Sequence, residues 1–157
     1  MNRIFAVQSK LLGEIAKYQN DKQERDWPLE WEVIHMVSSA KVGQHLAANR
    51  GVDGELAAIA CSIHDYGRIV TGKQQNHAEA GYQPVKMFLR ACSWFTEEEI
   101  ELLAHAAKVH SNKTEIGSPL EEVVKDADVL DCYQYGNQPE RPEQKLRLEK
   151  VRVELKI

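Results

Sequence analysis

The sequence lacks the features that mark membrane proteins and nucleic-acid-binding proteins. Its 157 residues contain no apolar run that approaches the roughly 18 residues of a membrane-spanning helix. Its formal net charge of −4 provides no strong basic field for nucleic acid or an anionic membrane. The first ten residues become polar too early for a secretory signal. We therefore expect no membrane partner and find no strong indication of a nucleic-acid partner.

Cysteine is also scarce. The three cysteines, Cys61, Cys92 and Cys132, are far apart and include no Cys-x-x-Cys pair. An odd number of widely spaced cysteines favours reduced thiols over a disulfide framework, and this indicates a cytoplasmic protein. Each thiol is expected to be a small core residue rather than a reactive group.

The residues that are present have the composition of an ordinary globular protein, 43% hydrophobic and 28% charged. The chain is long enough for one substantial core, and it has no internal repeat or low-complexity segment. We therefore predict a single domain over residues 1–157.

Apolar residues recur at helical spacing in almost every segment, which predicts an all-α fold, a compact helical bundle. Thr96 is followed three residues later by Glu99, the pattern of a capping box, and Ser118-Pro119 is a second helix start. Helices are expected over residues 3–18, 29–48 and 53–64, after His77, Thr96 and Ser118, and in a charged C-terminal segment over 140–156.

Three segments allow more than one interpretation. Residues 67–75 are predicted to form a loop, because they contain Gly67 and Thr71-Gly72. Pro84 predicts a kink or a break in the helix that starts at His77. The alternation of apolar residues near the C-terminus also fits a strand, but we favour a helix there.

A histidine and an aspartate, His64 and Asp65, stand side by side after an apolar run, and Gly67 follows. An imidazole next to a carboxylate is a suitable pair of ligands for a borderline divalent metal. Adjacent His-Asp pairs also occur by chance at helix ends, so this pair alone is a weak signal.

Four further polar residues, His35, His77, His110 and Asp128, fall on or beside apolar stripes of other helices. A buried charge must be paired or bound to a metal, because an isolated one costs several kcal/mol. Any single histidine of this kind is more often a hydrogen-bonded core residue than a ligand. Five placements from five helices favour a metal site, since helical bundles build such sites from facing helices.

Two more histidines, His45 and His105, are set aside. His45 lies close to the end of its helix, and His105 shares a face with Glu101 and is expected to be solvated. His105 and His110 compete for one role, and the apolar stripe favours His110.

The order of these residues resembles the HD-domain superfamily, which is named for its His-Asp pair. The segments 64–68, 77–81 and 110–111 resemble motifs of that family, and residues 125–131 resemble its closing Asp-Ala-Asp-x-Leu-Asp motif. The resemblance covers about residues 29–135, which would be the metal-binding core.

The resemblance implies that His35, His64, Asp65 and Asp128 hold one divalent metal, with Mn, Mg, Fe, Co, Ni and Zn not distinguished. His77 and His110 would hold a second metal or face the substrate phosphate. The chain lacks the adjacent His-His pair of the two-metal phosphodiesterases, which favours a mononuclear or weakly dinuclear site.

Members of the superfamily are typically metal-dependent phosphohydrolases or phosphodiesterases, often acting on nucleotides. By this resemblance the partner is a small phosphorylated substrate, and Asp65 is the catalytic residue, because it would bind metal and accept a proton from water. Arg68 and Lys73 would meet phosphate charge. Asp131 would orient a ligand, whereas Asp126 is expected to be exposed.

Two other functions remain open. The chain would be a non-catalytic metal- or nucleotide-binding regulatory module, or a diiron oxygenase if His77 and His110 are true ligands. The tryptophans Trp27, Trp31 and Trp94 would mark a homodimer surface if they are exposed.

Overall fold

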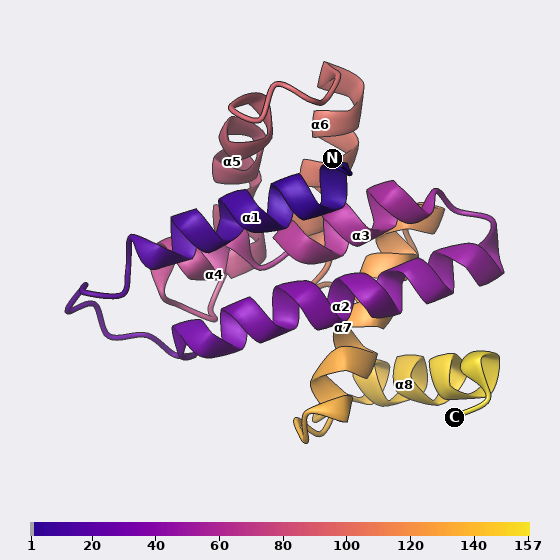
Figure 1. Cartoon of the computed structure of the whole chain (residues 1–157). Coiled ribbons are helices and arrows are strands. Elements are labelled where there is room, and N and C mark those ends of the chain that lie inside the picture. The colour runs from indigo at the N-terminus through magenta and orange to yellow at the C-terminus, as the bar shows by residue number, and fades with distance from the viewer. Residues whose placement is uncertain (1) are drawn as a thin grey trace.

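This computed structural model describes residues 2–157, which form a succession of helices joined by loops (Figure 1). No strand occurs among these residues, which confirms the all-α prediction, including the helical C-terminus. The helices are α1 (Arg3–Ala16), α2 (Leu29–Arg50), α3 (Gly54–Ile63), α4 (Tyr66–Thr71), α5 (His77–Arg90), α6 (Glu97–Val109), α7 (Pro119–Gln134) and α8 (Pro142–Leu155).

Local capping chemistry sets several helix ends. The predicted capping box of Thr96 and Glu99 forms at the start of α6, and Ser118 and Glu121 form another at the start of α7, where a helix start was predicted. Each box satisfies backbone N–H groups that have no partner inside the helix. Gly51 closes α2 with a φ of 67°, a left-handed conformation that glycine adopts without steric cost.

The predicted loop over residues 67–75 is wrong in its first half, because α4 occupies Tyr66–Thr71. Gly67 lies inside this helix and does not end it. A Cβ at Gly67 would lie 2.0 Å from the carbonyl oxygen of His77 and 2.6 Å from the amide of Gly81. The missing side chain therefore permits close contact between α4 and α5. Along α5 the helix continues through Pro84 without a break.

The long helix α2 packs most extensively on α3 and α7, and α5 packs on α4 and α6. Figure 1 shows α5 and α6 at one end of the molecule and α8 at the other, beside α7. The core contains fully buried leucines and isoleucines from separate helices, including Leu11, Leu46, Ile59, Leu103 and Leu130. Within residues 2–157, no helix combines the length and hydrophobicity that crossing a membrane requires.

Candidate metal centre

Five parts of the fold bring the expected ligands to one place. His35 projects from the second turn of α2, and the pair His64-Asp65 forms the turn between α3 and α4. His77 is the first residue of α5, His110 directly follows α6, and the last ligand, Asp128, lies in α7. All four histidines and Asp65 are buried.

Hydrogen bonds determine which ring nitrogen of each histidine carries a proton. Nδ1 of His64, His77 and His110 lies 2.6–2.7 Å from the backbone carbonyl oxygen three residues earlier. Nδ1 of His35 lies 2.6 Å from Oδ2 of Asp131. These oxygens only accept hydrogen bonds, so Nδ1 donates in all four rings. In the neutral imidazole, Nε2 then has a free lone pair, as a metal ligand requires.

The Nε2 atoms of His35 and His64 converge on one oxygen of Asp65. They lie 3.1 Å apart, and 3.4 and 3.3 Å respectively from Oδ2 of Asp65. Oδ1 of Asp128 lies 3.3 Å from Nε2 of His35 and 3.7 Å from that of His64. The four expected metal ligands are therefore within reach of a single ion.

The other oxygen of Asp65 faces a second pair of imidazoles. Its Oδ1 lies 3.0 Å from Nε2 of His77 and 3.4 Å from Nε2 of His110, and these two nitrogens are 3.0 Å apart. Asp65, His77 and His110 thus form a separate group with the spacing of metal ligands. The carboxylate of Asp65 joins the two groups.

Two unprotonated nitrogens about 3 Å apart repel each other unless a cation lies between them. Each imidazole pair, His35 with His64 and His77 with His110, has this arrangement when both of its rings are neutral. Oδ1 of Asp65 is also buried without a hydrogen-bond partner. Nitrogen and carboxylate oxygen donors of this kind suit divalent transition metals. The donor set therefore fits a divalent metal ion at the first group, and it offers ligands for another at the second.

The charges around the cluster shift its pKa values strongly. Burial lowers the pKa of His64, but the charge of Asp65 and a hydrogen bond to Asp128 outweigh this and raise it to about 10. Burial is likewise outweighed at His35, whose hydrogen bonds to Asp128 and Asp131 raise its pKa. Without metal, a proton is therefore held between His35 and His64. Burial lowers the pKa of His110 to about 4, so this imidazole is neutral at pH 7.

The two carboxylates stay ionised. Burial alone would raise the pKa of Asp65, but the charges of Arg68 and His64 hold it well below its usual range. The ammonium of Lys113 does the same for Asp128. A carboxylate this acidic is a good ligand and a poor proton acceptor at neutral pH. An ionised carboxylate suits the metal-ligand role that the resemblance implies for Asp65, and its role as a proton acceptor stays a prediction.

Arg68 is buried behind Asp65. Its Nε and Nη2 atoms donate to the two oxygens of Glu32 at 2.7 and 3.0 Å, and Nη2 also donates to Oδ2 of Asp65. Nη1 donates to Oε1 of Gln74 at 2.8 Å. Most of the guanidinium is therefore engaged by its own neighbours, although the side chain also lines a cavity that opens beside the histidine and aspartate cluster.

Lys73 lies outside this cavity. Its side chain is half-exposed and its ammonium lies 3.4 Å from Asp26. His105 is exposed and pairs with Glu121 at 2.8 Å, which leaves His110 as the histidine at the site. Of residues 72–75, Gln74 lines the cavity and Lys73 does not.

The expectation that Asp126 is exposed is wrong. Its side chain is buried and forms ion pairs with Arg50 at 2.8 Å and Arg147 at 2.7 Å. Arg147 belongs to α8, which covers this face of α7. Asp131, in contrast, lies where the sequence places it, against Nδ1 of His35.

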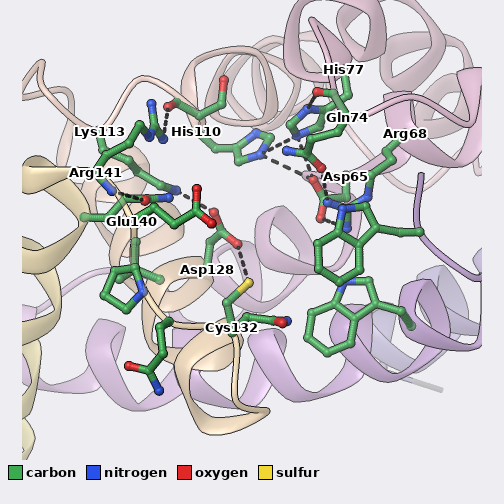
Figure 2. Close-up of a pocket in the computed structure, with 18 of the residues that line it drawn as sticks. Asp65, Arg68, Gln74, His77, His110, Lys113, Asp128, Cys132, Glu140 and Arg141 are labelled. Atoms are coloured by element: carbon green, nitrogen blue, oxygen red, sulfur yellow. Dashed lines mark hydrogen bonds and ion pairs between the residues drawn. The ribbon is translucent and has the colours of Figure 1, made fainter.

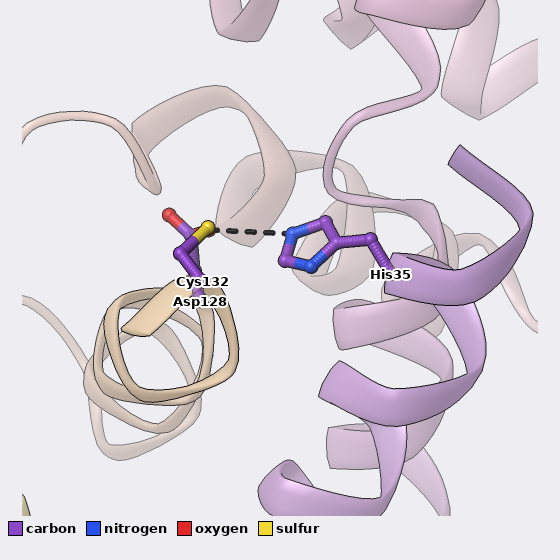
Figure 3. Close-up of side chains that lie close together, drawn as sticks. All are labelled: His35, Asp128 and Cys132. Carbon is purple, nitrogen blue, oxygen red and sulfur yellow. Dashed lines mark hydrogen bonds and ion pairs between the residues drawn. The ribbon is translucent and has the colours of Figure 1, made fainter. Parts of the chain in front are cut away.

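Sequence reasoning missed several residues of the site. Glu32 precedes His35 by one helical turn, and Cys132 follows Asp128 by one turn, so helical spacing was an available signal for both. Figure 3 shows Asp128 and Cys132 on α7 facing His35, and the three form a group with metal-ligand spacing. Lys113 lies in the irregular segment between α6 and α7, where no periodicity marked it.

A cavity of about 760 Å³ opens beside the cluster. Figure 2 shows Arg68, Gln74 and His77 on one side of it, with Lys113, Glu140 and Arg141 on the other. Trp27 and Trp31 also line it, and the ring of Trp31 stacks on that of His35 at a centroid distance of 5.0 Å. These two tryptophans therefore face the cavity, whereas Trp94 is exposed elsewhere.

A comparison with protein-family models matches residues 33–133 to the model described as HD domain. This segment is well over half of the chain, and it contains every residue of the two ligand groups. Comparisons with curated proteins and with solved structures give no significant match.

Proposed function

Because this chain belongs to the HD-domain family, we propose that it is a metal-dependent phosphohydrolase or phosphodiesterase. Its substrate would be a nucleotide or another small phosphorylated compound. The family is typically one of metal-dependent hydrolases, and the His and Asp groups offer the ligands that such a metal needs.

The observation that carries the proposal is the arrangement around Asp65. Four imidazole Nε2 atoms, each with its Nδ1 proton already donated elsewhere, surround the two oxygens of one carboxylate. Facing lone pairs of this kind are stabilised by a cation, which supports a metal ion at this site. The cavity beside the cluster has room for a small phosphorylated molecule.

A divalent metal in this site would polarise a phosphoryl group and lower the pKa of a bound water molecule. The protein residues supply the rest. His35, His64, Asp65 and Asp128 hold the metal, and the ion pair with Arg68 fixes the rotamer of Asp65. His77 and His110 face Oδ1 of Asp65, where they either hold a second ion or bind the substrate phosphate.

The proposal is tested by metal analysis and hydrolysis assays on the purified protein. We expect bound divalent metal, and release of phosphate or an alcohol from phosphate esters with Mn, Mg, Co, Ni or Fe supplied. Asp65→Ala and His64→Ala should each lose the metal and the activity, while the helical far-UV signal persists. His105→Ala is the matched control, because its imidazole pairs with Glu121 at the surface. Full activity in protein free of metal would contradict the proposal.

The second ligand group favours one alternative, a diiron oxygenase on the same fold. This function requires His77 and His110 to be ligands, and both lie within 3.4 Å of Asp65 Oδ1. Two irons per chain and oxygen consumption, without ester hydrolysis, would support it. Binding of metal and nucleotide with no turnover would instead indicate a regulatory module.

A further inference from the structure

Three cationic side chains other than histidine line the cavity: Arg68, Lys113 and Arg141. A phosphoryl group that enters the cavity needs hydrogen-bond donors that are not already used. The number of free donors therefore distinguishes the three candidates.

Arg68 has almost no free donors. A guanidinium has five N–H groups, and four of them are used by the two bonds to Glu32 and one each to Asp65 and Gln74. A bidentate contact with phosphate needs two free N–H groups, and Arg68 retains one. Its charge is also neutralised by two carboxylates. Arg68 is therefore a positioning residue for Asp65.

Arg141 lies at the rim. Its side chain is half-exposed, lies 3.3 Å from Glu143, and donates to the carbonyl oxygen of Ser111 at 3.3 Å. A solvated, flexible cation of this kind contributes little to binding compared with a desolvated one.

Lys113 differs from both. Its side chain is 1% exposed, yet within residues 2–157 the sole hydrogen-bond acceptor of its ammonium is Oδ2 of Asp128, at 2.5 Å. An ammonium has three N–H groups, so two remain. The backbone is held in place as well, because Arg147 Nε donates to the carbonyl oxygen of Lys113 at 2.8 Å.

Lys113 lies beside the ligand cluster, in contact with the second oxygen of Asp128. Asp128 directs Oδ1 toward His35 and Oδ2 toward Lys113, so the ammonium lies on the far side of this carboxylate from the imidazoles. Figure 2 shows Lys113 across the pocket from His77 and Arg68. Arg68 and Lys113 both line the cavity, Arg68 in contact with Asp65 and Lys113 in contact with Asp128.

We propose that Lys113 is the cation that binds a phosphoryl oxygen of the ligand, in place of Arg68 and Lys73. This inference rests on the proposed function, because it names the residue that recognises the phosphoryl group. The competing role is that Lys113 only neutralises Asp128. In that case its removal would disturb the metal and leave phosphate binding to the metal-loaded protein unchanged.

The test measures binding of inorganic phosphate by calorimetry to protein saturated with Mn. For Lys113→Met we expect phosphate affinity to fall by roughly 10- to 100-fold, the effect of losing a hydrogen bond from a charged group. Metal content should stay at the wild-type value, because Lys113 is not a ligand and its charge repels the metal. Lys113→Arg should restore much of the affinity.

Lys108→Met is the matched control, because Lys108 pairs with Glu79 outside the cavity. This variant should bind phosphate as tightly as the wild-type protein does. If Lys113→Met does not fold, Lys113→Gln, which keeps a donor for Asp128, serves for the same comparison. Unchanged phosphate affinity, or loss of the metal with phosphate binding intact after metal is resupplied, would overturn the role of Lys113 alone. A wild-type protein that binds metal but neither binds phosphate nor hydrolyses any ester would overturn the proposed function with it.

Discussion

At the scale of single residues, the protonation of the imidazoles decides how the site behaves. His35 and His64 direct Nε2 atoms at each other at 3.1 Å, and the neighbouring carboxylates raise the pKa of His64 to about 10. In the metal-free protein a proton therefore occupies the position between the two rings. Metal and proton compete for the same lone pairs.

This competition predicts that metal binding releases about one proton per ion at neutral pH. The folded-state pKa of His64 lies above the ordinary value of 6.5, so metal-free His64 is charged at pH 7 and becomes neutral only as pH rises toward 10. Apparent metal affinity should therefore rise about tenfold per pH unit between pH 7 and 9. Asp65 and Asp128 are already ionised in this range and release no proton.

Calorimetry in two buffers with different ionisation enthalpies measures the proton count. His105→Ala is a suitable control, since His105 lies away from the ligand groups and its loss should leave the count unchanged. An affinity that does not vary with pH over this range would contradict the protonated pair.

At the scale of elements, the close contact between α4 and α5 places His77 against Asp65. The contact depends on Gly67 and Gly81, whose backbones meet where any side chain would collide. The helix α4 holds Arg68 beside Asp65, and α5 begins at His77, so a shift between these two helices would separate the second ligand group.

Gly67→Ala is therefore expected to destabilise the protein by about 3 kcal/mol or more, the upper end of overpacking effects, because the clash is with backbone atoms. Urea unfolding measures the change. Gly13→Ala is the matched control: a Cβ at Gly13 in α1 meets no atom within 4 Å. That substitution should stabilise by about 0.5–1 kcal/mol, the ordinary gain of alanine over glycine in a helix. Equal stability of the two variants would contradict the close contact.

At the scale of the whole molecule, the ligands connect elements that are far apart in the sequence. They come from α2, the α3–α4 turn, α5, the end of α6, and α7. Unfolding separates them all, so a metal that binds them binds the native state alone. A metal bound by this set of ligands would therefore stabilise the whole chain and not one helix.

Removal of metal should lower the melting temperature. Free metal at about 100 times its dissociation constant stabilises the native state by about 2.7 kcal/mol. For a chain of this size the loss corresponds to roughly 5–10 °C. Thermal melting followed by circular dichroism, before and after chelation, measures the shift. In His64→Ala, chelation should have little effect, and a full shift in that variant would place the metal elsewhere.

The sequence by itself determined what depends on neighbouring residues. Helical spacing predicted the helices other than α4, which was expected to be a loop, and the capping boxes at Thr96 and Ser118 set two of the helix starts, because these signals act within a few residues. The order of His35, the pair His64-Asp65 and Asp128 resembles the HD-domain superfamily, and that resemblance implied the ligands.

Only the tertiary structure decided what depends on contacts between distant segments. Arg68 follows Asp65 closely in the sequence, which predicts a contact with phosphate. Only the structure shows that Arg68 donates hydrogen bonds to Glu32 of another helix and to Asp65 itself. Lys113 carries no periodic signal and acquires its position from α7 and α8. Asp126 is buried because α8 folds back over α7. Charge pairing and burial are set by segments that meet only after folding, and helical periodicity does not record them.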